Sequence, residues 1–227
     1  MTSHDLPPGT SREAASRPSV HAVLWLMIAV MAGFELMFWL AGQGLLPPAF
    51  DRWEVFLRLA FFDVLFDRAV AGEGIEPRLV WSLVTYAFLH GNILHLAFNG
   101  AAFLGLGNML VRAIGATRFV VLFLVTAVGG AVTFGLLADT QGPMVGASGA
   151  LFGMLAIITA WQERALRRTG RSREVIWKRI GGLVLLNVLL ALGLGGLLAW
   201  QAHLGGWVAG WLMAGLFTPR TGPLRML

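Results

Sequence analysis

Long apolar runs alternate with polar segments along most of the chain. Six such runs can be delimited: Val20–Gly42, Leu83–Leu110, Phe119–Ala138, Ser148–Trp161, Val175–Leu198 and His203–Phe217. A helix needs about 20 predominantly apolar residues to cross the hydrocarbon core of a bilayer. The pattern therefore predicts an all-α membrane protein in which residues 20–218 form one bundle of six transmembrane helices.

The segments outside these runs differ in composition. Residues 1–19 are polar and contain prolines, which predicts a flexible tail, and residues 219–227 form a second short tail. No short apolar stretch with a small-residue cleavage site precedes the first run, so we expect that run to be a retained span. Within the long segment 43–82, the part from Phe50 to Arg68 mixes apolar and charged side chains, which predicts an amphipathic element in the membrane interface.

Composition and charge support the membrane class and orient the bundle. Hydrophobic residues make up 57% of the chain and charged residues only 13%, against roughly 25% charged in soluble domains. The net charge of +5 does not indicate nucleic-acid binding, because basic residues lie in gaps between apolar runs. Those in 111–118, in 162–179 and near the C-terminus fall on one side, which the positive-inside rule makes cytoplasmic together with both termini. The chain has no cysteine, which excludes disulfides and thiol chemistry.

The start of the fourth run carries the first candidate for chemistry, Ser148 within Gly146-Ala147-Ser148-Gly149. The N–H groups in the first turn of a helix have no partner within the helix and can bind an oxyanion. Because this run is short, a helix from the cytoplasmic side would leave Ser148 roughly 10 Å below the outer membrane surface. The alternative is that these small residues only serve helix packing.

His203 begins the sixth run, on the same membrane side as Ser148. A histidine is a base that can activate a serine hydroxyl. Two GxxxG patterns, one in the fourth run and one in the sixth, are formed by Gly149, Gly153, Gly206 and Gly210. Such patterns let helix backbones approach closely, which would bring Ser148 and His203 within hydrogen-bond distance. Taken alone, His203 can also be a plain interfacial residue.

Three polar residues fall in the second predicted span: His90, His95 and Asn99. His95 and Asn99 share a helix face, and His90 precedes them by about one and a half turns. Polar groups at such depth face the bundle interior, where His95 and Asn99 could donate hydrogen bonds to an oxyanion and His90 could brace a loop. A metal site is the alternative, but no HExxH motif or carboxylate cluster accompanies these histidines.

Two further polar residues lie inside predicted spans, Glu35 in the first and Asn187 in the fifth. A polar or ionisable residue within the membrane is a functional candidate. For both residues we favour a structural hydrogen bond to a neighbouring span, because no other motif points to them.

Together these residues resemble the rhomboid family of intramembrane serine proteases. The family pattern is His-x4-His-x3-Asn in the second span, Gly-x-Ser-Gly at the start of the fourth, and a histidine followed by spaced glycines in the sixth. The matching residues are His90, His95, Asn99, Gly146, Ser148, Gly149, His203, Gly206 and Gly210. The resemblance covers about residues 20–218, and the order of the motifs along the spans makes it specific.

The resemblance implies a catalytic pair of Ser148 and His203 without a third acidic member. It implies an oxyanion site made by the Ser148 backbone, His95 and Asn99, with His90 as a structural residue beside it. The glycines of the motifs, Gly146, Gly149, Gly206 and Gly210, would likewise be structural. No metal or other cofactor is implied.

The resemblance also carries expectations about the first loop and the partners. Segment 43–82 is similar to the family's partly embedded first loop, but the family's Trp-Arg pair appears here as Trp81-Ser82. The implied activity is an intramembrane serine endopeptidase that cleaves in or near transmembrane helices through an acyl-enzyme. Its partners would be transmembrane protein substrates and membrane lipid, with no nucleic acid. We expect a multi-pass protein of a bacterial inner membrane.

Two other classes compete with this interpretation. Non-catalytic rhomboid-like proteins bind transmembrane helices but typically lack the serine or the histidine, and both are present here. A small transporter would be expected to show internal repeats and paired broken helices, and the two halves of this sequence show no repeat.

Overall fold

The computed structural model describes residues 22–140, 142–193 and 198–220, and the regular elements in these ranges are all helical. The longer helices are α1 (Ala22–Gly42), α5 (Ile93–Ile114), α6 (Ala116–Leu137), α7 (Ser148–Arg168), α8 (Glu174–Gly193) and α9 (Trp200–Leu216). Shorter helices between α1 and α5 are η1 (Pro48–Phe50), α2 (Arg52–Leu59), α3 (Asp63–Val70), α4 (Pro77–Thr85) and η2 (Tyr86–Phe88). The all-α prediction is confirmed. The predicted tail 1–19 lies outside the described residues, as does most of the predicted tail 219–227.

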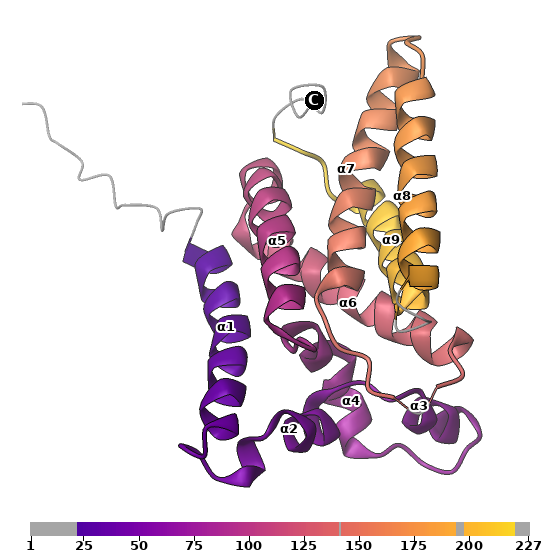
Figure 1. Ribbon diagram of the computed structural model, residues 1–227. Coiled ribbons are helices and arrows are strands. Elements are labelled where there is room, and N and C mark those ends of the chain that lie inside the picture. Colours follow the sequence, from indigo (N-terminus) through magenta and orange to yellow (C-terminus); the bar gives the residue numbers. More distant parts are fainter. Residues whose placement is uncertain (1–21, 141, 194–197, 221–227) are drawn as a thin grey trace, which may run out of the picture.

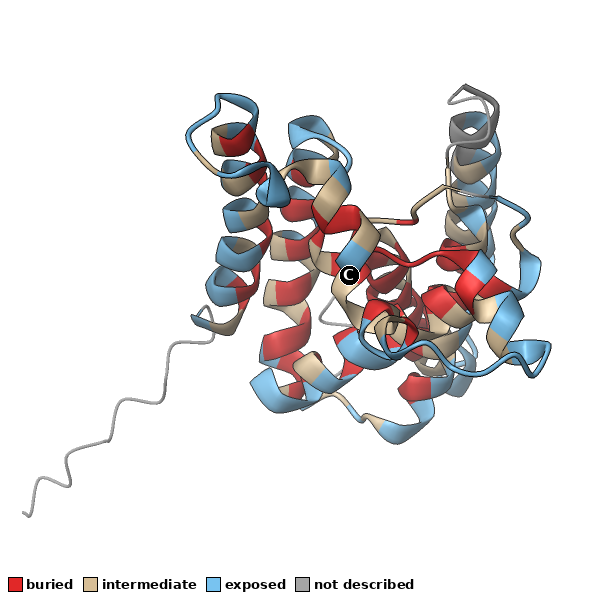
Figure 2. Ribbon diagram, turned by 90° about the horizontal axis from the view of Figure 1, so that it is seen from below, coloured by how far each residue is buried: buried red, intermediate tan, exposed pale blue. Residues whose placement is uncertain are grey.

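The longer helices form a bundle with α1 at one edge and α8 at the opposite edge (Figure 1). The short helices α2, α3 and α4 gather across one end of it, at the bottom of this view. The most extensive contacts are those of α7 with α9 and of α6 with both, whereas α8 makes few contacts with α7. Buried residues therefore concentrate on the central helices (Figure 2), and large apolar side chains of α1 and α8 such as Trp25, Trp39 and Leu189 are exposed.

In the described part of the chain, three helices are long and apolar enough to cross a membrane: α1, α5 and α6. Helix α9 has only 17 residues. The last turns of α7 carry Glu163, Arg164, Arg167 and Arg168, and the first turns of α8 carry Glu174, Lys178 and Arg179. The predicted count of six spans stays a prediction.

The start of the second predicted span, Leu83–Leu110, is wrong. Its first residues belong to α4 and η2, and α5 begins only at Ile93. Asn92 sets this boundary, because its extended backbone (φ −165°, ψ 173°) ends the loop and its side chain accepts a hydrogen bond from the His95 N–H at 2.9 Å. His90 therefore lies in the loop before α5, not on the helix face that carries His95 and Asn99.

The other boundaries differ less. The fourth run was expected to end at Trp161, but α7 continues to Arg168 because the residues that follow are good helix formers despite their charge. The fifth run was expected to reach Leu198, and residues 194–197 lie outside the described part. The amphipathic element predicted between Phe50 and Arg68 is two helices, α2 and α3, rather than one.

Residues between α2 and α3 are extended and pair with the loop after α6. Phe61 N–H donates to the Met144 carbonyl at 3.2 Å, and Met144 N–H donates to the Phe61 carbonyl at 2.8 Å. Phe61 and Met144 are both buried. This backbone pairing explains the break in the amphipathic element, and it holds the loop that leads into α7 against the first loop of the chain.

The backbones of α7 and α9 touch through glycines. A Cβ atom added to Gly206 would collide with the carbonyl of Gly149, and one added to Gly210 would collide with the carbonyl of Gly153. The two GxxxG patterns therefore face each other, which is the close approach that the sequence predicts. Because α7 starts at Ser148 and α9 at Trp200, the contact brings the first turns of the two helices together.

We expect Gly206→Ala to destabilise the fold by about 1–3 kcal/mol, because the new methyl group must push α9 away from α7. Gly215→Ala on the same helix is the matched control, since a Cβ there meets no atom within 4 Å. That change should be neutral or stabilising by up to about 1 kcal/mol. Thermal unfolding in detergent micelles measures both, and equal midpoints for the two variants would contradict the backbone contact.

Candidate functional site

The first turns of α7 and α9 bring one hydroxyl and one imidazole together. Ser148 Oγ lies 2.8 Å from His203 Nε2. The His203 ring is stacked on Phe152, one turn along α7, with ring centroids 4.3 Å apart and an angle of 8° between the planes. His203 is buried. The packing fixes the ring against α7 with Nε2 turned to the serine, so the structure places the two candidate catalytic side chains in hydrogen-bond contact.

The other ring nitrogen of His203 also has a partner. His203 Nδ1 lies 2.6 Å from Asn187 Oδ1 of α8. Asn187 was expected to form a structural hydrogen bond to a neighbouring span, and its partner is the candidate catalytic histidine of α9. In the sequence, Asn187 is noticeable as a single amide inside an apolar run. That pattern does not show which residue the amide contacts.

His95 and Asn99 of α5 lie against Gly146, which precedes Ser148 by two residues. A Cβ added to Gly146 would lie 2.7 Å from His95 Cε1, 2.8 Å from His95 Nε2 and 3.5 Å from Asn99 Nδ2. Gly146 has a φ of 120°, a conformation that also favours glycine. The His95 ring therefore occupies the place that a side chain of residue 146 would take, with the Asn99 amide next to it.

The Asn99 side chain has a hydrogen-bond donor without a partner, and this donor lies near Gly146. Among the described residues, its Nδ2 atom is buried and has no hydrogen-bond partner. An unsatisfied buried donor costs about 1–3 kcal/mol, so we expect a water molecule or a bound group to accept a hydrogen bond from it. An oxygen atom of a bound reactant next to the Asn99 amide would satisfy it.

Loop residues His90–Asn92 orient the neighbouring His95. The Gly91 N–H donates to His95 Nδ1 at 3.5 Å, and an acceptor role for Nδ1 leaves the ring proton on Nε2. The His90 ring contacts the His95 ring edge-on, with centroids 5.0 Å apart. Burial lowers the pKa of His90 to about 3, with a smaller contribution from His95, so the loop histidine is neutral.

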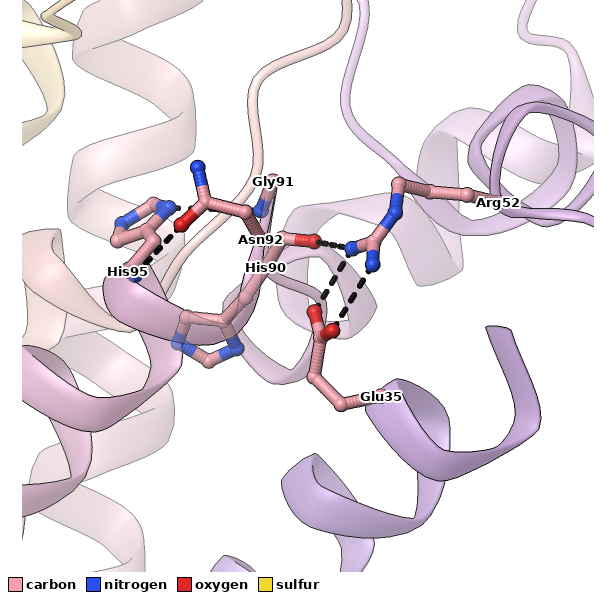
Figure 3. Close-up of polar contacts among 6 residues, drawn as sticks. All are labelled: Glu35, Arg52, His90, Gly91, Asn92 and His95. Atoms are coloured by element: carbon pink, nitrogen blue, oxygen red, sulfur yellow. Dashed lines mark hydrogen bonds and ion pairs between the residues drawn. The ribbon is translucent and has the colours of Figure 1, made fainter. Parts of the chain in front are cut away.

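An ion pair holds this loop in place (Figure 3). Arg52 of α2 forms a bidentate pair with Glu35 of α1, with nitrogen–oxygen distances of 2.7 and 2.8 Å. The same guanidinium also donates a hydrogen bond to the His90 carbonyl. One arginine therefore connects the first long helix, the first loop and the loop that caps α5.

Glu35 was expected to bond to a neighbouring span, but its partner is Arg52 in the first loop. The first loop is anchored although Ser82 stands in place of the family arginine. Ser82 is buried and its hydroxyl donates to the Leu79 carbonyl at 3.0 Å, whereas Trp81 Nε1 donates to the Arg58 carbonyl at 2.9 Å. Arg52 supplies the charged contact instead.

An apolar cavity of about 510 Å³ opens beside His203, between α8 and α9. Leu183, Val184 and Trp207 line it together with Asn187 and His203. Among the described residues, no group of three or more histidine, cysteine, aspartate or glutamate side chains could hold a metal ion.

These features define a helical integral membrane protein with a serine–histidine pair at the meeting point of two helices. The Rhomboid domain matches residues 77–220, which is more than half of the chain, so the chain belongs to the rhomboid family. It is 32% identical to RHOMBOID-like protein 5 of Arabidopsis thaliana over 61% of this chain and 46% of that protein.

Two further relatives carry protease names. The chain is 30% identical to rhomboid protease GluP of Bacillus subtilis over 63% of this chain and 27% of that protein. It is 32% identical to rhomboid-like protease 1 of Toxoplasma gondii over 63% of this chain and 49% of that protein. The matched region is therefore about a quarter to a half of the length of these relatives.

Glu35→Gln should destabilise the protein by about 1–3 kcal/mol, because it removes the carboxylate that neutralises Arg52 in a largely buried pair. Glu54→Gln is the control. Glu54 and Arg58 form an exposed pair at 3.6 Å, whose loss should cost at most about 0.5 kcal/mol. Thermal unfolding in micelles compares them, and an equally small effect of both changes would show that the Arg52 pair does not stabilise the fold.

Proposed function

We propose that this rhomboid family member is an intramembrane serine endopeptidase that cleaves transmembrane protein substrates. The observation that carries the proposal is the contact between Ser148 Oγ and His203 Nε2 at 2.8 Å, beside the unpartnered Asn99 donor. A hydroxyl, a base and an oxyanion donor within one small region are the parts that acyl transfer needs. The protease names of two relatives support the same activity.

In the proposed reaction, His203 Nε2 takes the proton of Ser148 as Oγ attacks the carbonyl carbon of the scissile peptide. The carbonyl oxygen becomes an oxyanion. His203 then gives the proton to the leaving amine as the carbon–nitrogen bond breaks. In the second half, His203 takes a proton from water as the water oxygen attacks the acyl carbon, and returns it to Ser148 Oγ as the bond between Oγ and that carbon breaks. No metal or cofactor takes part.

The oxyanion would be held by three donors. Two are side chains that lie against Gly146, His95 through Nε2 and Asn99 through Nδ2. The third is the Ser148 N–H, because the first-turn N–H groups of a helix are not used within the helix. Donors that are fixed before reaction stabilise the charge without reorganising, which is commonly the largest contribution to catalysis.

We further propose that α1 and α5 to α9 all span the membrane, with both termini on the cytoplasmic side of a bacterial inner membrane. The charged end of α7 and the charged start of α8 would lie on that side, since lysine and arginine are enriched there. The site lies at the opposite end of α7. A substrate helix would approach from the side, between α5 and α8, and unwind to expose its backbone.

Ser148→Ala should abolish cleavage of a labelled single-span substrate by the purified protein, because no nucleophile remains. Ser172→Ala is the matched control: Ser172 lies in the exposed loop before α8, and its change should leave the rate unchanged. Persistent cleavage by pure Ser148→Ala protein would refute the proposed function.

Asn99→Ala should lower kcat by about 10²- to 10³-fold, because one oxyanion donor is lost. KM should change little, since the donor acts mainly on the charge that forms in the transition state. Steady-state kinetics with the same substrate separate the two constants. A large rise in KM with an unchanged kcat would show that Asn99 binds the substrate instead.

A further inference from the structure

We propose that Asn187 is a positioning residue for His203, so that the site works as a serine–histidine–asparagine chain across α7, α9 and α8. The proposal rests on the proposed function and adds a member to the expected pair. Its basis is the contact of 2.6 Å between Asn187 Oδ1 and His203 Nδ1, together with the Ser148 contact on the other ring nitrogen.

The orientation of the Asn187 amide follows from a second hydrogen bond. Asn187 Nδ2 donates to the Leu183 carbonyl at 3.0 Å. If the amide were flipped, its oxygen would face that carbonyl oxygen, and two acceptors would repel each other. The amide oxygen is therefore the atom that faces His203.

That orientation determines which nitrogen of His203 carries the proton. An amide oxygen can only accept, so His203 Nδ1 must donate and must hold the ring proton. Nε2 is then the free acceptor that faces Ser148 Oγ, which is the state that a general base needs. With the proton on Nε2 instead, the lone pair of Nδ1 would face the lone pairs of Asn187 Oδ1. One neutral amide on α8 thus selects the active tautomer.

The surroundings strengthen this hydrogen bond. Asn187 and His203 line the same cavity, whose other walls are apolar side chains such as Leu183 and Val188. A hydrogen bond in apolar surroundings is stronger than one in water. Helix α8 makes few contacts with α7. One of them is a hydrogen bond that Arg179 donates to Gln162. Moving the Asn187 part of α8 outward would therefore remove the acceptor from His203.

The first test is the tautomer itself. Nitrogen-15 NMR of histidine-labelled protein in micelles should show His203, assigned by the signal lost in His203→Gln, as the neutral form with the proton on Nδ1. In Asn187→Leu, which cannot accept, the proton should move to Nε2 in a substantial fraction of molecules. A wild-type His203 with its proton on Nε2 would overturn the proposal, whatever the variants do.

The second test is kinetic, with the same single-span substrate. Asn187→Leu should lower kcat by about 10- to 100-fold with little change in KM, because most of the imidazole is in the wrong form. Asn187→Asp keeps an accepting oxygen and should recover kcat to within about tenfold of the wild type. Val184→Ala, which lines the same cavity on the same helix, is the control and should keep the wild-type kcat.

The outcomes separate the two proposals. A wild-type kcat in Asn187→Leu, or no recovery in Asn187→Asp where Asn187→Leu is impaired, would overturn the positioning role. If Asn187→Leu fails to fold, the NMR result on the wild type and the activity of Asn187→Asp still decide. A wild-type protein with the expected tautomer that cleaves no substrate would contradict the proposed function alone.

Discussion

The backbone contact between α7 and α9 is the constraint on which the site depends. At this contact a carbonyl of one helix occupies the space that a side chain would need on the other, at Gly206 opposite Gly149 and at Gly210 opposite Gly153. Helices with ordinary side chains at the contact stay about 8–10 Å apart. At Gly206 and Gly210 the α7 backbone lies closer than that, so the glycines set the spacing and register at which Ser148 and His203 meet.

The site also requires hydrogen-bond partners for the N–H and carbonyl groups of the non-helical backbone around it. Non-helical backbone at membrane depth is tolerated only where protein or water supplies its hydrogen bonds. Met144 pairs with Phe61, the Gly146 N–H donates to the Tyr86 carbonyl at 3.0 Å, and Asn92 caps α5. Arg52 adds the bond to the His90 carbonyl. The first loop therefore acts as a scaffold for the loops that carry the candidate site residues.

Much of this could be predicted from the sequence because it depends on local pattern. The apolar runs predicted the long helices, and the paired GxxxG patterns predicted that α7 and α9 approach closely. The start of α5 was missed because the apolar residues of α4 and η2 continue those of α5, so periodicity alone cannot locate the Asn92 cap. The partners of Glu35 and Asn187 were missed because both contacts join residues far apart in sequence, and a lone polar residue in a span does not reveal what it faces. The roles of Ser148, His203, His95 and Asn99 in catalysis stay predictions.

The most direct test of the central claim is an experimental structure of the protein after reaction with a serine-directed phosphonate. We expect a phosphorus atom bonded to Ser148 Oγ, with a phosphoryl oxygen within hydrogen-bond distance of His95 Nε2 and Asn99 Nδ2. Phosphorus on another residue, or an adduct at Ser148 whose oxygen points away from both α5 side chains, would contradict it.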